Sequence, residues 1–117
     1  MAKYAIIVQA GEHELARALH GLLYARELSE GGHTVRLLFD GAGTGWIAKM
    51  EDPGWKYHEA YRWVKDRGLI AGVCQYCSTA YGATQAARQG GLLLLGEASG
   101  HPSLLPLVNE GYQLLVL

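Results

Sequence analysis

The chain lacks long apolar runs, basic patches and low-complexity segments. Its longest apolar runs, at residues 91–96 and 114–117, are far too short to cross a bilayer, so we expect no membrane-spanning segment. Ten basic and eleven acidic residues are mixed along the chain and give a formal net charge of -1, so nucleic acid is a poor candidate partner. Half of the residues are hydrophobic, which argues against disorder.

Cysteine is also scarce, and the chain is short. A length of 117 residues is enough for one domain with a core and too little for two, so we expect a single domain over residues 1–117. A strand pattern begins at Tyr4 and leaves no room for a signal peptide, which favours a cytoplasmic protein. In that compartment the only two cysteines, Cys74 and Cys77, are more typical of catalysis or metal binding than of a structural disulfide.

Strand and helix patterns alternate from one end of the chain to the other. Continuous apolar runs such as Tyr4–Val8 are typical of parallel strands that are covered on both faces. Strands are expected at residues 4–8, 34–39, 69–73, 92–95 and 112–117, with helices at 12–30, 46–51, 57–66, 78–88 and 102–110. This alternation implies parallel crossovers. The predicted fold class is α/β, a three-layer α/β/α sandwich around a mostly parallel five-stranded sheet.

The loops that follow parallel strands emerge at one edge of the sheet, where ligands bind. We therefore expect Cys74 and Cys77 to be the reactive residues and further side chains from these loops to line a pocket. His13 and His101 lie near helix starts, where either could act as a proton donor or thiolate partner. The expected pocket residues are Gln9, Gly11, His13, Asp40, Gly41, Glu97 and His101.

Cys74 ends a predicted strand, and Cys77 follows where a helix pattern begins. Free N–H groups at a helix start favour a thiolate, so we expect an accessible, ionised Cys74. The pair could be a nucleophile with its neighbour, a dithiol redox pair, half of a zinc site, or two buried structural cysteines. Zinc would need two more cysteine or histidine ligands, and the chain offers only scattered histidines. We expect no metal and no cofactor.

The chain resembles the DsrE/DsrF-like family, which includes the YchN and Tus sulfur-relay proteins. It shares the length, the order of elements, Asp40-Gly41 after the second strand, and the spacing from Cys74 through Cys77 to Gly82. An arginine that often precedes the family glycine is Tyr81 here. The resemblance covers nearly the whole chain and implies a small α/β/α protein that assembles into homotrimers or hexamers.

The resemblance also implies a function. Its sulfur-relay members carry a persulfide at the position of Cys74 and pass it to protein partners, which suggests a sulfur carrier or sulfurtransferase. Several family members have no demonstrated activity. Two alternatives therefore remain beside it: a non-catalytic oligomeric module that binds a small ligand, and a dithiol redox protein that uses Cys74 and Cys77.

Overall fold

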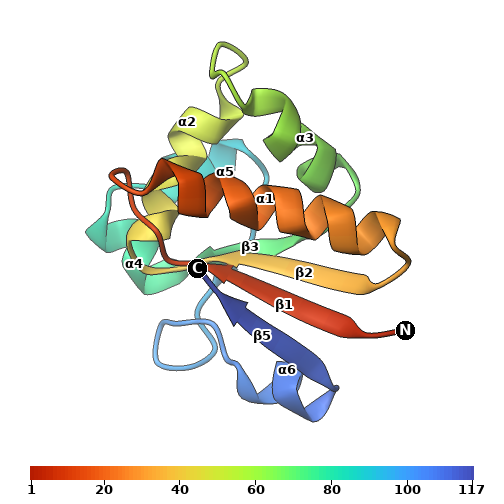
Figure 1. Cartoon of the computed structure of the whole chain (residues 1–117). Helices are drawn as coiled ribbons and strands as arrows, with labels where there is room; N and C mark the ends of the chain where they lie inside the picture. The colour runs from red at the N-terminus through yellow and green to blue at the C-terminus, as the bar shows by residue number, and fades with distance from the viewer.

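A parallel sheet forms the centre of the computed structural model, which describes residues 1–117 (Figure 1). The strands are β1 (Lys3–Val8), β2 (Thr34–Phe39), β3 (Ile70–Cys74), β4 (Leu94–Leu95) and β5 (Tyr112–Val116). Their order across the sheet is β4-β3-β2-β1-β5, and every neighbouring pair is parallel. The predicted α/β class with a parallel five-stranded sheet is confirmed.

The helices between the strands are mostly short. They are α1 (Leu15–Glu30), the 3-10 helix η1 (Gly41–Trp46), α2 (Ile47–Glu51), α3 (His58–Asp66), α4 (Gln75–Ala80), α5 (Thr84–Gln89) and α6 (Leu105–Asn109). The single long helix expected over residues 78–88 is wrong. The chain breaks it at Gly82, whose φ of 68° is left-handed and ends a helix. None of the helices has both the length and the apolar character needed to span a bilayer.

One face of the sheet carries the main core. Helices α1, α2 and α3 lie over this face in Figure 1. Phe39 from the sheet, Leu22 from α1 and Tyr61 from α3 are among the largest buried side chains, and they belong to one apolar cluster. Burying a side chain of this kind contributes about 1.5–3 kcal/mol relative to leaving it exposed. The core therefore holds the sheet and three helices together as one body.

The opposite face is covered more thinly. Leu38 lies between the core residues Leu37 and Phe39 on β2. Because successive side chains of a strand point to opposite faces, Leu38 points to the other side of the sheet. There it lines a pocket of about 250 Å³ together with Leu107 of α6. No residue of α6 is buried. Helices thus lie on both faces, but a single short helix and the loop before it make up the second layer.

Helix η1 ties together the strand ends at the carboxyl edge. A Cβ atom placed on Gly43 would lie only 2.1 Å from the carbonyl oxygen of Val8, so glycine is required where η1 crosses the end of β1. The buried hydroxyl of the next residue, Thr44, donates to the carbonyl oxygens of Gly41 at 2.9 Å and Cys77 at 3.3 Å. The end of β1, η1 and α4 are therefore fixed relative to one another.

Candidate active site

The carboxyl edge of the sheet brings four chemically useful side chains together. Asp40 follows β2, Cys74 ends β3, Cys77 lies in the first turn of α4, and His101 lies in the loop after β4. One oxygen, nitrogen or sulfur atom from each of them lies within 4.8 Å of the others. We call these four residues the thiol cluster.

Cys74 is the most enclosed member of the thiol cluster. Its Sγ lies 3.3 Å from Nδ1 of His101 and accepts the backbone N–H of Cys77 at 3.4 Å. The same sulfur lies 3.9 Å from the carbonyl oxygen of Gly100. No part of Cys74 is exposed, whereas Cys77 is partly exposed. Of the two thiols, only Cys77 is therefore in contact with solvent.

This enclosure changes the acidity of the thiol. Burial raises the pKa of Cys74 to about 12, although the backbone N–H of Cys77 acts in the opposite direction. Hydrogen bonding to the side chains of Cys77 and Asp40 raises that pKa further, because it favours the protonated form. The sequence-based expectation of an accessible thiolate at Cys74 is therefore wrong. Desolvation raises the pKa of Cys74 more than the backbone N–H at the helix start lowers it.

A tight turn holds His101 over Cys74. Ala98 and His101 exchange two backbone hydrogen bonds, of 2.8 and 3.0 Å. The two residues between them, Ser99 and Gly100, have positive φ angles of 55° and 90°, as in a type I′ turn. The N–H of Tyr76 donates to the carbonyl oxygen of Gly100 at 2.9 Å, and the Tyr76 ring lies 5.0 Å from the imidazole. The turn is thus anchored on α4, beside both cysteines.

Gln9 and Gly41 lie next to Asp40 of the thiol cluster, Gln9 through a hydrogen bond and Gly41 as the next residue in the chain. Gln9 donates from Nε2 to Oδ2 of Asp40 at 2.9 Å. The N–H of Asp40 donates to the carbonyl oxygen of Val8 at 2.9 Å, which fixes its backbone against β1. Gly41 follows at once and begins η1. The ends of β1 and β2 thereby orient the carboxylate.

Three residues that the sequence placed in the same pocket lie elsewhere. Gly11 and His13 line a separate pocket of about 490 Å³, together with Tyr81. The His13 side chain is 93% exposed, and its ring pairs with a neighbouring glutamate. Glu97 lines the pocket on the thinly covered face of the sheet. The loops after the parallel strands do lie at one edge of the sheet, but they diverge there and line separate pockets.

Sequence reasoning missed three side chains that support the thiol cluster. Ser78 and Thr44 are the only buried polar residues, and both donate to backbone carbonyl groups beside the cysteines. A serine four residues after Cys74 is a usable signal, because serine hydroxyls in helices bond back to that position. Tyr76 carries no such signal, because its contact with His101 depends on how the later loop folds back.

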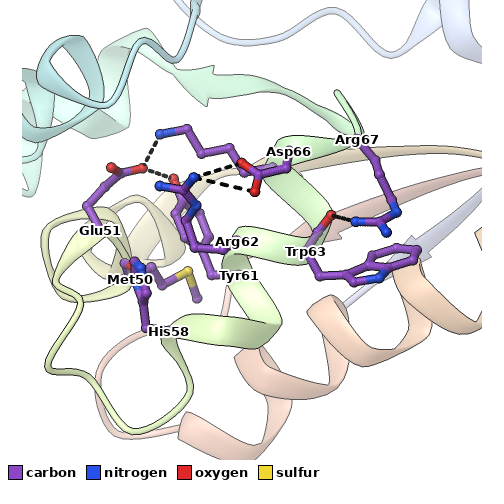
Figure 2. A network of polar contacts seen from close by, with 9 residues as sticks. Met50, Glu51, His58, Tyr61, Arg62, Trp63, Asp66 and Arg67 are labelled. Carbon is purple, nitrogen blue, oxygen red and sulfur yellow. Dashed lines mark hydrogen bonds and ion pairs between the residues drawn. The ribbon is translucent and has the colours of Figure 1, made fainter.

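A second polar cluster lies away from this edge, between α2 and α3 (Figure 2). The hydroxyl of Tyr61 donates to Glu51, and Nζ of Lys65 lies 2.6 Å from the same carboxylate. Burial alone would raise the pKa of Glu51, but the hydrogen bonds from Lys65 and Tyr61 hold it below its ordinary value. Burial and the bond to Glu51 raise the pKa of Tyr61. Every charge here has a partner, which indicates a structural role.

Comparison with known proteins identifies a family and a distant relative. The model of the DsrE/DsrF-like family matches residues 2–117. A protein named "Uncharacterized protein MJ0733" from Methanocaldococcus jannaschii is 27% identical over 99 residues, which cover 85% of this chain and 78% of that relative. The relative's name assigns no activity, so this match supports kinship and not a function.

Proposed function

This chain belongs to the DsrE/DsrF-like family, and we propose that it is a cytoplasmic sulfur carrier that holds a persulfide on Cys74. The observation that carries the proposal is the position of the Cys74 sulfur, 3.3 Å from an imidazole nitrogen of His101 and within 4.8 Å of the Cys77 sulfur. A buried thiol with a base and a second thiol beside it has what sulfur transfer needs. The resemblance to sulfur-relay proteins supports the same function.

The first step takes place at Cys77, because Cys77 is the accessible thiol. Its sulfur attacks the outer sulfur of a donor persulfide. A sulfur–sulfur bond to Cys77 forms while the donor's own sulfur–sulfur bond breaks. The proton of the Cys77 thiol goes to the donor, which leaves as a thiol.

The second step moves the sulfur inward. The Cys74 sulfur attacks the outer sulfur on Cys77, so that a bond to Cys74 forms and the bond to Cys77 breaks. His101 takes the proton from Cys74 at Nδ1 and returns it to the Cys77 sulfur. A thiol and a persulfide are consumed and a thiol and a persulfide are produced, so no oxidant is needed. Burial then shields the persulfide from thiols in solution.

Dithiol redox chemistry is the second candidate. The two sulfur atoms are free thiols that lie close together in a Cys-x-x-Cys arrangement, which is the starting point for a disulfide. A disulfide-bonded oxidant would accept two electrons and leave as two thiols, with Cys74 and Cys77 joined. The experiment below separates this outcome from persulfide storage by mass.

We also propose that the chain forms a homo-oligomer, a trimer or a hexamer. Leu105 and Val108 on α6 are 67% and 52% exposed, and Val116 on β5 is 57% exposed. These apolar side chains lie on the thinly covered side of the molecule. Apolar surface of this kind is typical of protein–protein contacts. A second copy of the chain would complete the missing layer.

The test of the sulfur-carrier proposal is sulfur loading of the reduced, chelator-treated protein. After incubation with a small-molecule persulfide and removal of the donor, the mass of the wild type should rise by one sulfur atom, and peptide mapping should find it on Cys74. Cys74→Ser should lose stable loading, and Cys77→Ser should load more slowly. His101→Ala should slow loading, while the matched variant His13→Ala, at an exposed histidine outside the thiol cluster, should load as the wild type does.

Two results would overturn the proposal. The first is a wild type whose mass does not change with the donor although circular dichroism shows it to be folded. The second is a mass loss of two hydrogens with a Cys74–Cys77 disulfide in place of the added sulfur, which would favour the redox protein.

A further inference from the structure

The thiol cluster has the donor atoms of a metal site. Asp40, Cys74, Cys77 and His101 offer one carboxylate oxygen, two sulfurs and one imidazole nitrogen. Zn²⁺ is bound in proteins by each of these ligand types, and structural zinc sites bind four of them tetrahedrally. The sequence argued against zinc because it contains a single cysteine pair. Folding supplies the other two ligands, and His101 lies 27 residues from Cys74 in the chain.

The distances suit one small cation. Zn–S bonds of about 2.3 Å and Zn–N bonds of about 2.0–2.1 Å place tetrahedral sulfur and nitrogen ligands about 3.5 Å apart. The Cys74 sulfur and the His101 Nδ1 atom are separated by 3.3 Å. The largest separation among the four ligand atoms is within 4.8 Å, and two tetrahedral sulfurs would lie about 3.8 Å apart. Side-chain movements of about 1 Å would complete the shell.

Neighbouring groups already orient these ligands. Gln9 holds one oxygen of Asp40 at 2.9 Å, and the N–H of Cys77 points at the Cys74 sulfur at 3.4 Å. The backbone of His101 is fixed by its two hydrogen bonds to Ala98. Metal ligands in proteins are commonly held by such hydrogen bonds, which set their direction. The four donors converge from three segments of the chain, the end of β2, the β3–α4 junction and the loop after β4.

We propose that Asp40, Cys74, Cys77 and His101 bind a thiophilic divalent cation, with Zn²⁺ as the expected ion. The inference goes beyond the proposed function and does not depend on it. A cation bound to both sulfurs would occupy the groups that sulfur transfer requires. The metal-loaded protein would therefore be unable to accept a persulfide, and a chelator would restore loading.

The test uses the full chain, reduced and freed of metal. Titration with Zn²⁺ in competition with a chromophoric chelator should give one ion per chain. Co²⁺ in its place should give a thiolate-to-cobalt charge-transfer band and the strong visible bands of tetrahedral cobalt. Losing an outer partner of a metal ligand commonly costs about 10- to 100-fold in affinity, so Cys77→Ser and His101→Ala should each lose at least that much. The matched variant His13→Ala should bind as the wild type does.

Three results would overturn the metal site. They are no stoichiometric Zn²⁺ binding by folded wild type, cobalt spectra without a thiolate band, and equal affinity in His101→Ala and His13→Ala. The wild-type cobalt spectrum decides even if a cysteine variant fails to fold. Sulfur loading is measured separately with chelator present, so failure of the sulfur-carrier proposal leaves this result unaffected.

Discussion

Replacing Gly43 by alanine should damage both the stability and the thiol cluster. The added Cβ would lie 2.1 Å from the carbonyl oxygen of Val8 and 2.8 Å from its carbonyl carbon, whereas real Cβ atoms essentially never come within 3.0 Å of such atoms. Backbone therefore has to move by about 1 Å. Overpacking of this kind typically costs about 1–3 kcal/mol. For a chain of this size each kcal/mol lowers the melting temperature by about 4 °C.

The neighbouring Gly45 supplies a matched control. It lies in the same 3-10 helix, is exposed, and has no atom within 4 Å of the place that a Cβ would take. Gly45→Ala should leave the melting temperature unchanged or raise it slightly, because alanine restricts the unfolded chain. Thermal unfolding followed by circular dichroism measures the difference. Equal melting temperatures for Gly43→Ala and Gly45→Ala would refute the reasoning.

The displacement should also reach the cysteines. Gly43 precedes Thr44, whose hydroxyl donates to the carbonyl oxygen of Cys77. A shift of η1 away from β1 would therefore stretch the contact that holds α4. We expect Gly43→Ala to load sulfur more slowly than Gly45→Ala, even at a temperature where both variants are folded. Equal loading rates would show that the contact between η1 and α4 does not position the thiols.

Two further predictions concern the rest of the fold. Glu51→Gln should lower the free energy of unfolding at pH 7 by about 1–2 kcal/mol, because it weakens the bonds from Lys65 and Tyr61. The folded-state pKa of Glu51 lies below its ordinary value of 4.5, so the stabilisation that the carboxylate supplies is present above pH 4.5 and is lost as the pH falls through the folded-state value. Urea unfolding measures the difference in free energy of unfolding between variant and wild type, and an equal difference at pH 7 and pH 3 would contradict this. Light scattering should show that Leu105→Glu is a monomer, while the control variant Leu23→Glu on α1 remains an oligomer. A wild type that is monomeric at micromolar concentration would contradict the proposed assembly.

The sheet could be predicted because its signals are local. Each strand is a short apolar run between turn residues, and parallel order follows from the helices between strands. The predicted strand at residues 34–39 agrees with β2 to the residue. The helix at residues 78–88 could not be predicted as two pieces, because its alanine-rich pattern continues across the break. A glycine inside a helix pattern can adopt either helical or left-handed dihedral angles, so the sequence does not show that Gly82 adopts the left-handed conformation that ends α4.

The thiol cluster was predictable only in part. Topology places Asp40, Cys74 and Cys77 at one edge, since Cys74 ends a parallel strand and the other two residues follow shortly after strand ends. The Ser99-Gly100 pair marks a turn, and His101 was expected in the pocket, but the sequence does not show that this turn brings the imidazole nitrogen to 3.3 Å from the Cys74 sulfur. The same turn places the carbonyl oxygen of Gly100 at 3.9 Å from the buried Cys74 sulfur. The sequence therefore placed both cysteines at this edge of the sheet but predicted the wrong environment for the first of them.

The two proposals for the thiol cluster follow from one physical feature. Cys74 is buried beside three other electron-rich groups that can bind an electron-poor atom: a second sulfur, an imidazole nitrogen and a carboxylate. A sulfane sulfur and a Zn²⁺ ion are both electron-poor; the first binds by a covalent bond to one thiol, and the second by coordination to both sulfurs. The two occupants therefore compete for Cys74. The amount of sulfur loaded should fall in proportion to the Zn²⁺ bound, and independent loading of both would show that they use different atoms.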